Sequence, residues 1–368
     1  MSSYRSPRSS PWRCKRLRTS SLPLDLLHNV LSRLPTTLLI KLRTVCREWR
    51  DIIDDPHFAA MHVKSGVENP RILLLSKPSR GADPRFTAVS DELLVTSLPK
   101  SAVTAWSHGV GASCHGLLCF DDLLHGGTYL LNPLTRDIVS LSSVGPCKRW
   151  HQRRIAIGVD HLTSRYKILR MSSFIGKDRQ ICSMRAEVLD QGSRSWRDIA
   201  SVPPCLLLGK PVFTAGSIHL IVAGAGDHVH RIWSFDLAKE EFARTPSPEF
   251  CEANLVDLRG VLGLVDYSHQ ESHDVWVMEE SRVWVKKYRI PLRLPWGVNS
   301  HRFGFFMGCG GRKMVLKFLK SVLSYDPATD ELEYVQRGGA SMDRLVGSIT
   351  VSLLSPAKLW NADKVSYL

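Results

Sequence analysis

The feature that most restricts the fold of this 368-residue chain is a turn that recurs at a nearly constant interval. Asp190, Asp236, Glu279 and Asp326 each follow a short apolar run and precede another, and they are separated by 46, 43 and 47 residues. Asp or Asn at the first position of a turn accepts a hydrogen bond from its own backbone two residues on, which starts a hairpin. A four-stranded unit that repeats about every 40 to 50 residues is typical of a β-propeller blade.

Two further series of residues fit the same pattern. Asn132 and Asp160 each begin a turn after an apolar run. Gly116, Gly216 and Gly260 each precede a run of apolar residues, and the last two glycines are 44 residues apart. The β region is about 285 residues long, which at this period allows a propeller of about six blades, or seven.

The two ends of this β region are expected to meet. The last strand candidate, residues 348–354, has no hairpin partner after it, and the first strand candidate lies at residues 71–75. Pairing between them would close the ring and remove its free sheet edges. The predicted fold class is multidomain α plus all-β. It has a short helical module at 21–62, a linker at 63–70 and the propeller at 71–356.

The helical module is predicted from apolar residues at helical spacing. In the first segment they form one stripe, and Pro35 ends it because proline cannot continue the hydrogen-bond ladder. The stripe consists of Leu26, Leu27, Val30, Leu31 and Leu34. A second helix is expected from Thr36 or Thr37 to a break at residues 54–56. Its apolar positions are Leu38, Leu39, Leu42, Val45, Cys46, Trp49, Ile52 and Ile53.

Two helices of this size cannot bury so many apolar groups between them, since fewer than about 40 residues rarely sustain an independent core. Some of these side chains should therefore face another protein or the following domain. We expect Ile52, Ile53 and Phe58 to contact the first blade of the propeller and the remaining surplus to point outward.

The module resembles an F-box. The Leu22-Pro23 opening, the Arg33-Leu34-Pro35 hinge, the run from Val45 to Trp49 and the exit from Asp55 to Phe58 occur in the order of that family. The resemblance implies three short helices that bind a Skp-type adaptor and, through it, the cullin and RING subunits of an SCF ubiquitin ligase. The implied adaptor contacts are Leu22, Pro23, Leu26, Leu27, Val30, Leu31, Leu34, Pro35, Leu38, Leu42, Val45 and Trp49.

Most of residues 70–355 resemble the plant F-box-associated domain, a degenerate kelch-like propeller. The matching pieces, in the family's order, are 113–119, 131–136, 166–168, 195–197, 216–220, 234–237, 275–278 and 325–329. The paired glycines and the Tyr–Trp signature of a well-formed kelch repeat are missing, which leaves the number of blades open. The resemblance implies that the propeller binds a target protein for ubiquitination.

The positive charge of the chain is concentrated at its start. Residues 1–20 hold six basic and no acidic side chains, out of a net charge of +14. The remaining surface is mildly basic, well short of a nucleic-acid-binding stripe. We expect a disordered basic tail at 1–20 and a second tail at 357–368.

Several sequence features bear on the compartment. We find no secretory signal and no run of about 18 apolar residues that would suit a membrane span. The nine cysteines are scattered without Cys-x-x-Cys spacing, which indicates reduced thiols. We expect a cytoplasmic or nuclear protein that has no contact with a membrane.

Catalytic and metal-binding patterns are weak. His219, Asp227, His228 and His230 lie close enough in sequence for a metal site to be conceivable. The simpler interpretation places His219 in a strand, against a cross-strand partner, and the others in a polar loop. The sequence contains neither a nucleophile elbow nor a phosphate-binding loop. We therefore expect no catalytic residue, no metal and no cofactor.

One basic run outside the tail is a candidate partner-binding loop. It contains Lys148, Arg149, Trp150, Arg153 and Arg154. Pairing with phosphates and stacking on the tryptophan would suit a nucleic acid, and an acidic protein would suit the same charges. The other interpretation is a solvated loop between blades, and we do not expect nucleic acid as a partner.

These observations lead to one main hypothesis and two alternatives. The main hypothesis is a non-catalytic substrate receptor of an SCF ubiquitin ligase, whose target the sequence does not identify. The first alternative is a propeller without a ligase role that binds nucleic acid or an acidic protein through residues 148–154. The second is an enzyme with its site in the central channel, for which no acid–base pair is found.

Overall fold

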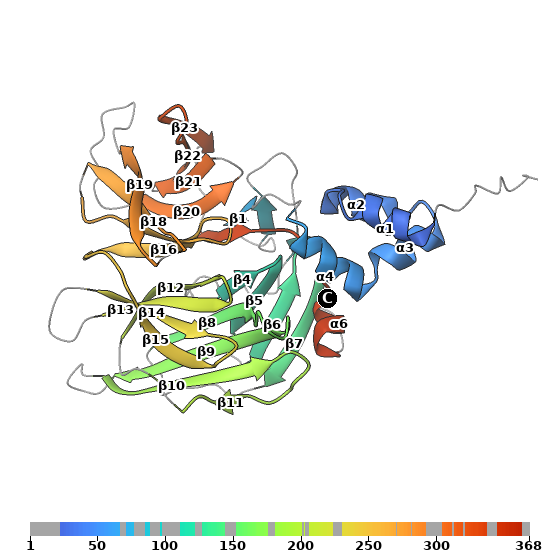
Figure 1. The fold of residues 1–368 in the computed structure, drawn as a ribbon, viewed down its shortest axis with the longest axis horizontal. Helices are drawn as coiled ribbons and strands as arrows, with labels where there is room; N and C mark the ends of the chain where they lie inside the picture. Colours follow the sequence, from blue (N-terminus) through green and yellow to red (C-terminus); the bar gives the residue numbers. More distant parts are fainter. Residues whose placement is uncertain are drawn as a thin grey trace, which may run out of the picture.

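Short helices at the start of the chain lie beside a much larger body of antiparallel β-sheet (Figure 1). The computed structural model describes residues 23–66, 71–76, 85–88, 96–97, 111–121, 127–143, 152–175, 181–200, 202, 206–223, 230–269, 271–280, 282–291, 304–310, 313–318, 321–336 and 344–362. The predicted tail at 1–20 lies outside these residues. No described helix is long and apolar enough to cross a membrane.

Four helices form the helical module, which we define as residues 23–66. They are α1 (Leu24–Leu31), α2 (Thr36–Leu42), α3 (Arg47–Ile53) and α4 (Pro56–Lys64). The second predicted helix is divided into α2 and α3 because Cys46 has an extended backbone, with φ of −155°. Thr44 Oγ1 donates to the carbonyl of Lys41 after α2 (2.8 Å), and Cys46 Sγ accepts from the Trp49 backbone at the start of α3.

Helix α4 begins where the sequence was interpreted as a break. Asp55 is its N-cap, and Oδ1 accepts from the backbone N–H of His57 (2.6 Å) and of Phe58 (3.4 Å). Pro56 stands at the first helical position, where its missing N–H costs no hydrogen bond. Residues 54–56 therefore end one helix and start the next.

The β region consists of six four-stranded antiparallel sheets in the described residues. The first contains β24 (Arg344–Ile349), β1 (Arg71–Ser76), β2 (Arg85–Ala88) and β3 (Thr96–Ser97), and the second β4 (Gly111–Cys114), β5 (Leu117–Asp121), β6 (Gly127–Asn132) and β7 (Asp137–Ser143). The third contains β8 (Gln152–Val159), β9 (Tyr166–Ile175), β10 (Ile181–Asp190) and β11 (Arg197–Asp198), and the fourth β12 (Leu207–Thr214), β13 (Ser217–Val222), β14 (Arg231–Asp236) and β15 (Glu241–Thr245). The fifth contains β16 (Ala253–Asp257), β17 (Leu262–Asp266), β18 (Ser272–Met278) and β19 (Trp284–Pro291), and the sixth β20 (Gly304–Gly310), β21 (Lys313–Phe318), β22 (Ser321–Asp326) and β23 (Glu331–Gln336).

The sheets are arranged as a ring. One strand of each sheet contacts the corresponding strand of the next, in the order β24, β4, β8, β12, β16, β20 and back to β24. These six strands are therefore the innermost ones of a closed β-propeller. The predicted propeller is confirmed, and its described sheets match the lower of the two expected blade numbers.

The ring is closed by strands from opposite ends of the β region. Strand β24 pairs with β1 in antiparallel register, with Arg71 opposite Ile349 and Leu73 opposite Gly347. The predicted pairing is thus confirmed, although the last strand lies at 344–349 rather than 348–354. Residues 350–355 leave the sheet and lead to helix α6 (Pro356–Trp360), which falls at the start of the predicted C-terminal tail.

Four of the recurring turns form as the sequence indicates, whereas those at Asp190 and Glu279 are closed by backbone hydrogen bonds from Ser193 and Arg282, each at 2.9 Å. Asn132, Asp160, Asp236 and Asp326 each accept a hydrogen bond through Oδ1 from the backbone N–H two residues on, at 2.8–3.0 Å. At the glycine-led hairpins the chain needs two successive residues with positive φ, as at His115 (48°) and Gly116 (81°). This φ pattern is that of type I′ turns, which match the twist of paired strands.

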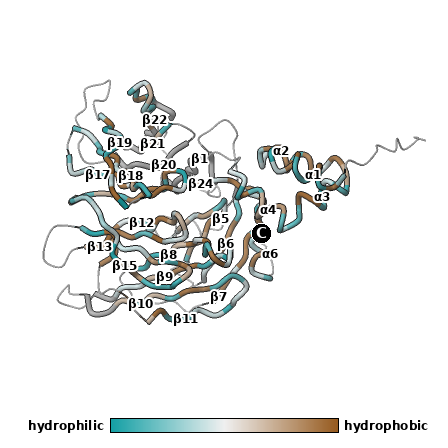
Figure 2. Tube along the Cα trace, in the orientation of Figure 1, coloured by the Kyte–Doolittle hydropathy of each residue, from teal (hydrophilic) through white to brown (hydrophobic). Residues whose placement is uncertain are grey.

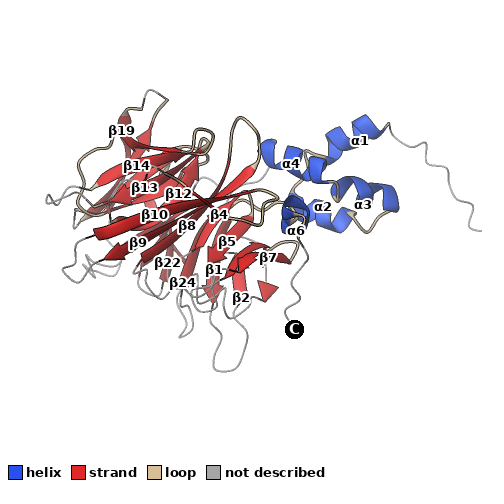
Figure 3. Ribbon diagram, turned by 90° about the horizontal axis from the view of Figure 1, so that it is seen from below, coloured by secondary structure: helices blue, strands red, loops and turns tan. Residues whose placement is uncertain are grey.

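All these turns lie on one side of the ring, which we call the turn face. It carries the hairpin between the first and second strands of a sheet and the hairpin between the third and fourth. The helical module and α6 lie on the same side, since Lys64 Nζ donates to Ser164 Oγ in the β8–β9 turn (3.4 Å). Figure 3 shows the helices gathered at one end of the strands.

Candidate functional site

Helix α1 carries two apolar pairs on adjacent sides, one buried and one exposed. Leu27 and Leu31 are 4% and 0% exposed, whereas Leu26 and Val30 are 53% and 56% exposed. Each pair is four residues apart and so shares one side of the helix. One pair fills the core of the helical module, and the other remains in solvent. Figure 2 shows hydrophobic residues on α1 and α2 as well as within the sheets.

The outward pair belongs to a larger exposed apolar surface on the module. Leu38 on α2 and Val45 in the turn before α3 are also exposed, as is Leu24 at the start of α1. We call these five residues, Leu24, Leu26, Val30, Leu38 and Val45, the apolar surface. Burying a Val or Leu side chain is worth about 1.5–3 kcal/mol, so each of these side chains would gain from a partner.

A compact cluster holds the apolar surface in place. It consists of Leu27, Leu31, Leu39, Ile52, Ile53 and Phe58, with Leu34, Leu42 and Trp49 packed at its edge. The ion pair between Arg43 Nε and Asp54 Oδ1 (2.7 Å) joins the turn after α2 to the end of α3. Because the core is complete without the exposed residues, a partner can bind them without unfolding the module.

The structure divides the predicted adaptor contacts into three groups. Exposed positions are Pro23, Leu26, Val30, Pro35, Leu38 and Val45; partly buried positions are Leu34, Leu42 and Trp49; buried positions are Leu27 and Leu31. Leu22 lies outside the described residues. Leu24 was not among the predicted contacts, and it is exposed where α1 begins.

The described part of the predicted basic loop is used inside the propeller. Arg153 NH1 lies 3.5 Å from Oδ2 of the buried Asp121, and its side chain is 9% exposed. Arg154 Nε donates to the carbonyl of Gly209 on the next blade (2.8 Å), and burial lowers the pKa of this arginine. These two side chains therefore join neighbouring blades. Lys148, Arg149 and Trp150 lie outside the described residues.

The carboxylate beside Arg153 is strongly desolvated. Burial raises the pKa of Asp121, while the charge of Arg170 and the hydrogen bond from Thr128 Oγ1 (2.6 Å) act against that rise. Arg170 itself is buried, donates through Nε (3.0 Å) and Nη2 (2.9 Å) to the same oxygen of Glu187, Oε2, and lies 3.9 Å over the Trp196 ring. The Arg170–Glu187 pair thus lies within the β8–β11 sheet, whereas the Arg153–Asp121 pair joins that sheet to β5 of its neighbour.

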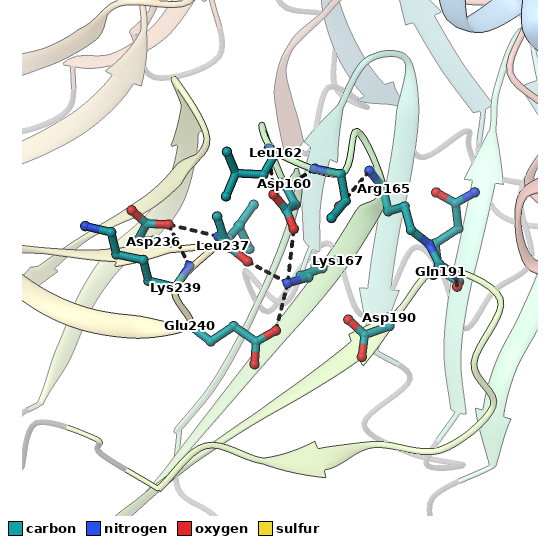
Figure 4. A network of polar contacts seen from close by, with 12 residues as sticks. Asp160, Leu162, Arg165, Lys167, Asp190, Gln191, Asp236, Leu237, Lys239 and Glu240 are labelled. Atoms are coloured by element: carbon teal, nitrogen blue, oxygen red, sulfur yellow. Dashed lines mark hydrogen bonds and ion pairs between the residues drawn. The ribbon is translucent and has the colours of Figure 1, made fainter.

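A second polar network joins the β8–β11 and β12–β15 sheets at the turn face (Figure 4). Lys167 Nζ donates to Glu240 Oε1 (2.7 Å) and to the Leu237 carbonyl (2.6 Å), and it lies 3.4 Å from Asp160 Oδ2. Arg197 pairs with both Glu240 and Asp190. Its two cations pair with three carboxylates, and the contacts to Glu240 cross the sheet boundary, so the network holds two blades together.

The network shifts the acid–base properties of its carboxylates. The hydrogen bond from Arg197 lowers the pKa of Glu240, and Lys167 lowers it further. Burial raises the pKa of Asp160, but the hydrogen bonds from Leu162 and Thr163, together with Lys167, outweigh burial and bring it below the ordinary value. Both groups therefore stay ionised around neutral pH, as a structural network requires.

The histidine group considered for metal binding is only partly described. His219 lies on β13 and its Nδ1 is 2.6 Å from Oγ of Ser234, its cross-strand neighbour on β14. Burial lowers the pKa of His219 to about 4, so the ring is neutral. The predicted strand position of His219 is confirmed, while Asp227 and His228 lie outside the described residues. Within the described ranges, no three His, Cys, Asp or Glu residues are grouped so as to hold a metal.

Family comparisons match both parts of the chain. Residues 19–60 match the F-box domain, and residues 70–344 match the F-box associated beta propeller domain. The first match covers the described helices α1 to α3, which carry the apolar surface. The second begins one residue before β1 and ends at the first residue of β24.

Curated relatives of the chain are F-box proteins from Arabidopsis thaliana. F-box protein At3g07870 is 28% identical over 319 residues, which cover 76% of this chain and 75% of the relative. F-box/LRR-repeat protein At2g43260 is 28% identical over 292 residues, covering 73% and 67%. F-box/kelch-repeat protein At3g23880 is 24% identical over 296 residues, covering 74% and 80%. The chain is therefore a plant F-box protein, and its β-propeller belongs to the F-box-associated family.

Proposed function

We propose that this protein is the substrate receptor of an SCF ubiquitin ligase and has no catalytic role of its own. The observation that carries the proposal is the apolar surface: five large aliphatic side chains exposed on a helical module whose core is already complete. The Skp-type adaptor covers this surface and links the chain to the cullin and RING subunits.

The chemistry of such a receptor is positioning. A target held beside a charged ubiquitin carrier presents its lysine at a high effective concentration, and no side chain of the receptor takes part in the transfer. The charged groups described in the propeller are consistent with this role, since they pair with one another within and between blades.

The target binds the face of the propeller that lies away from the helical module. The turn face is occupied by the module and α6, and its hairpins are short and ordered by Asx hydrogen bonds. The described connection from β15 to β16, residues 246–252, lies at the opposite face. A target bound there would not compete with the adaptor for space.

Adaptor binding is tested by substitutions that spare the core. Val30→Asp and Leu38→Asp place a charge on the apolar surface, and we expect each to weaken binding to a purified Skp-type adaptor at least tenfold. Leu162→Asp is the matched control, because Leu162 is 75% exposed in the β8–β9 turn and should leave binding unchanged. Isothermal titration calorimetry with the full chain measures the three affinities.

Two results would overturn the proposal. One is wild-type protein that does not bind the adaptor at micromolar concentration. The other is equal affinity of the wild-type, Val30→Asp and Leu38→Asp proteins. Leu31→Asp is unsuitable for this test, because Leu31 is fully buried and its loss would unfold the helices.

A further inference from the structure

The last described residues of the chain run from the propeller to the helical module. After β24, residues 350–355 cross the turn face beside the β4–β7 sheet, and α6 ends next to α4 (Figure 1). We call residues 350–362 the C-terminal segment. It contacts both parts of the molecule and so connects them a second time, at a point far from α4 in the sequence.

Buried hydrogen bonds fix the segment to the propeller. Asn132 Nδ2 donates to the carbonyls of Ser352 (3.0 Å) and Leu354 (2.7 Å), while its Oδ1 accepts from the backbone N–H of Leu134 in the β6–β7 turn. Ser355 Oγ donates to Asp137 Oδ2 at 2.8 Å. The asparagine that starts the β6–β7 turn therefore also binds the backbone of the segment.

The fit between the segment and the propeller is close. A Cβ atom at Gly116 would lie 2.6–2.7 Å from Ser352 and from the Thr350 carbonyl, so only glycine leaves room for the backbone to pass. Val351, Ser352 and Leu354 are buried. This part of the chain is thus an integral layer on the second blade.

The other side of the segment reaches the helical module. Leu353 packs against the buried cluster of the module and also against the propeller cluster that contains Leu354 and Trp360. Lys358 Nζ donates to the Asp54 carbonyl, at the end of α3, with a distance of 2.6 Å. Trp360 is buried with its ring 6.4 Å from that of Tyr166.

Helix α4 packs against the helical module with one face and against the propeller with another. Phe58 belongs to the module cluster, and His62 Nε2 lies 2.8 Å from the Leu34 carbonyl. Ala59 and Val63, each one residue further on, belong to the propeller cluster. The predicted boundary between module and linker at 62/63 therefore falls inside a helix that both parts share. Ile52, Ile53 and Phe58, expected to contact the first blade, instead fill the module core, where Leu353 reaches them.

We propose that the C-terminal segment is a clasp that fixes the orientation of the helical module on the propeller, with Leu353 and Lys358 as positioning residues. The consequence rests on the proposed function: the clasp sets the direction in which a bound target is presented to the ubiquitin-transfer machinery. Without the clasp, α4 would remain as the connection, and the module would swing about it.

The geometry is tested in the full chain without any partner. Ketone-bearing amino acids at Asp51 on α3 and Lys287 on β19, both exposed, carry spin labels, and pulsed electron resonance gives the distribution of distances between them. We expect a narrow distribution for the parent protein. The double variant Leu353→Ser/Lys358→Ala should broaden it at least twofold, and Leu162→Ser, an exposed control, should leave it unchanged.

A second variant guards against loss of folding. Lys358→Glu alters one exposed side chain whose amine reaches Asp54, and it should broaden the distribution by a smaller amount at an unchanged melting temperature. Narrow distributions in both variants would overturn the clasp. Adaptor affinity is measured in parallel: its absence in the parent protein overturns the proposed function but leaves the distance result intact.

Discussion

The helical module leaves many of its large apolar side chains exposed, whereas the propeller buries most of its own. Of ten large hydrophobic side chains exposed in the described residues, six lie within residues 23–66 and four in the much longer β region. A closed ring can bury one blade against the next, and every sheet finds a partner on both sides. Four short helices have no second layer, so part of their apolar surface stays in water until another protein covers it.

Exposed apolar side chains have a different meaning in the two parts of the molecule. In the propeller, exposed apolar residues such as Leu162 and Val283 lie in the turns between strands. In the module they lie on α1, α2, α4 and the turn before α3, around a complete core. Substitutions in the two parts should therefore change stability in different ways, and the largest change is expected in the propeller.

The largest loss of stability is expected from a cavity at an aromatic pair in the β12–β15 sheet. Phe235 is fully buried and its ring lies 4.7 Å from that of Phe242. Replacing a buried Phe by Ala costs about 3–5 kcal/mol, so Phe235→Ala should lower the free energy of unfolding by that amount. Urea denaturation followed by tryptophan fluorescence measures it. A loss below about 1 kcal/mol would mean that Phe235 does not lie in a packed core.

The next change creates the matching cavity in the helical module. Leu31→Ala should cost about 2–5 kcal/mol, but the loss should be confined to the helices. Hydrogen exchange is the appropriate measurement, since amides of α1–α3 should exchange faster while those of β12–β15 keep their protection. Uniform acceleration in both parts would show that module and propeller unfold as one unit.

The network between the β8–β11 and β12–β15 sheets predicts a pH effect. Because the folded-state pKa of Glu240 is lowered, its contribution to stability is complete above the pKa of the unfolded chain, about 4.3, and is lost as pH falls through the folded value. Arg197 is half exposed, so Arg197→Gln should cost only about 0.2–1 kcal/mol at pH 7.

The measurement is urea unfolding of both proteins at pH 7 and at pH 3. The difference between wild type and Arg197→Gln should shrink as the pH falls toward the lowered pKa of Glu240. Lys239→Gln is the control, since this neighbouring lysine is exposed and should show no such pH dependence. A constant difference across pH would contradict the role given to the Arg197–Glu240 pair.

The smallest change in the free energy of unfolding is expected at Val30, which is adjacent in sequence to Leu31. Val30→Ser alters a residue one position before Leu31, yet the free energy of unfolding should change by less than about 0.5 kcal/mol because Val30 is more than half exposed. The comparison with Leu31→Ala uses the same hydrogen-exchange assay. Equal losses in the two variants would remove the distinction between the inner and outer faces of α1.

Much of the propeller was predictable because its turns are local. Four turn side chains accept a hydrogen bond from the backbone N–H two residues on, namely those of Asn132, Asp160, Asp236 and Asp326. Because donor and acceptor are so near each other in the sequence, the local sequence specifies the turn geometry. The ring closure was predictable for a different reason, since a strand without a hairpin partner leaves a free edge.

The missed helices carry a signal that was present in the sequence. Asp55-Pro56 starts α4 and Ser355-Pro356 starts α6, and in both cases a capping side chain precedes a proline at the first helical position. The same dipeptides also suit turns, and the difference is decided by the apolar residues that come after them. Phe58 and Trp360 find buried sites far away in sequence.

The division of the candidate site could not be predicted from α1 alone. Leu26 with Val30, and Leu27 with Leu31, are two equally spaced apolar pairs, and the position of α3 and α4 decides which of them is buried. The fate of Arg153 and Arg154 likewise depends on distant partners, Asp121 and the Gly209 carbonyl. Such choices are made by tertiary packing.

The pairing of β1 with β24 also has a consequence for synthesis. The first blade needs strands from both ends of the β region, so the ring cannot close until the ribosome has released residues 344–349. Until then β1 lacks its inner neighbour, and a chain ended by a premature stop codon would keep an unpaired strand edge, a feature that promotes aggregation. The helical module, made first, would be attached to an unfinished receptor, and only a chain translated to its end would mature.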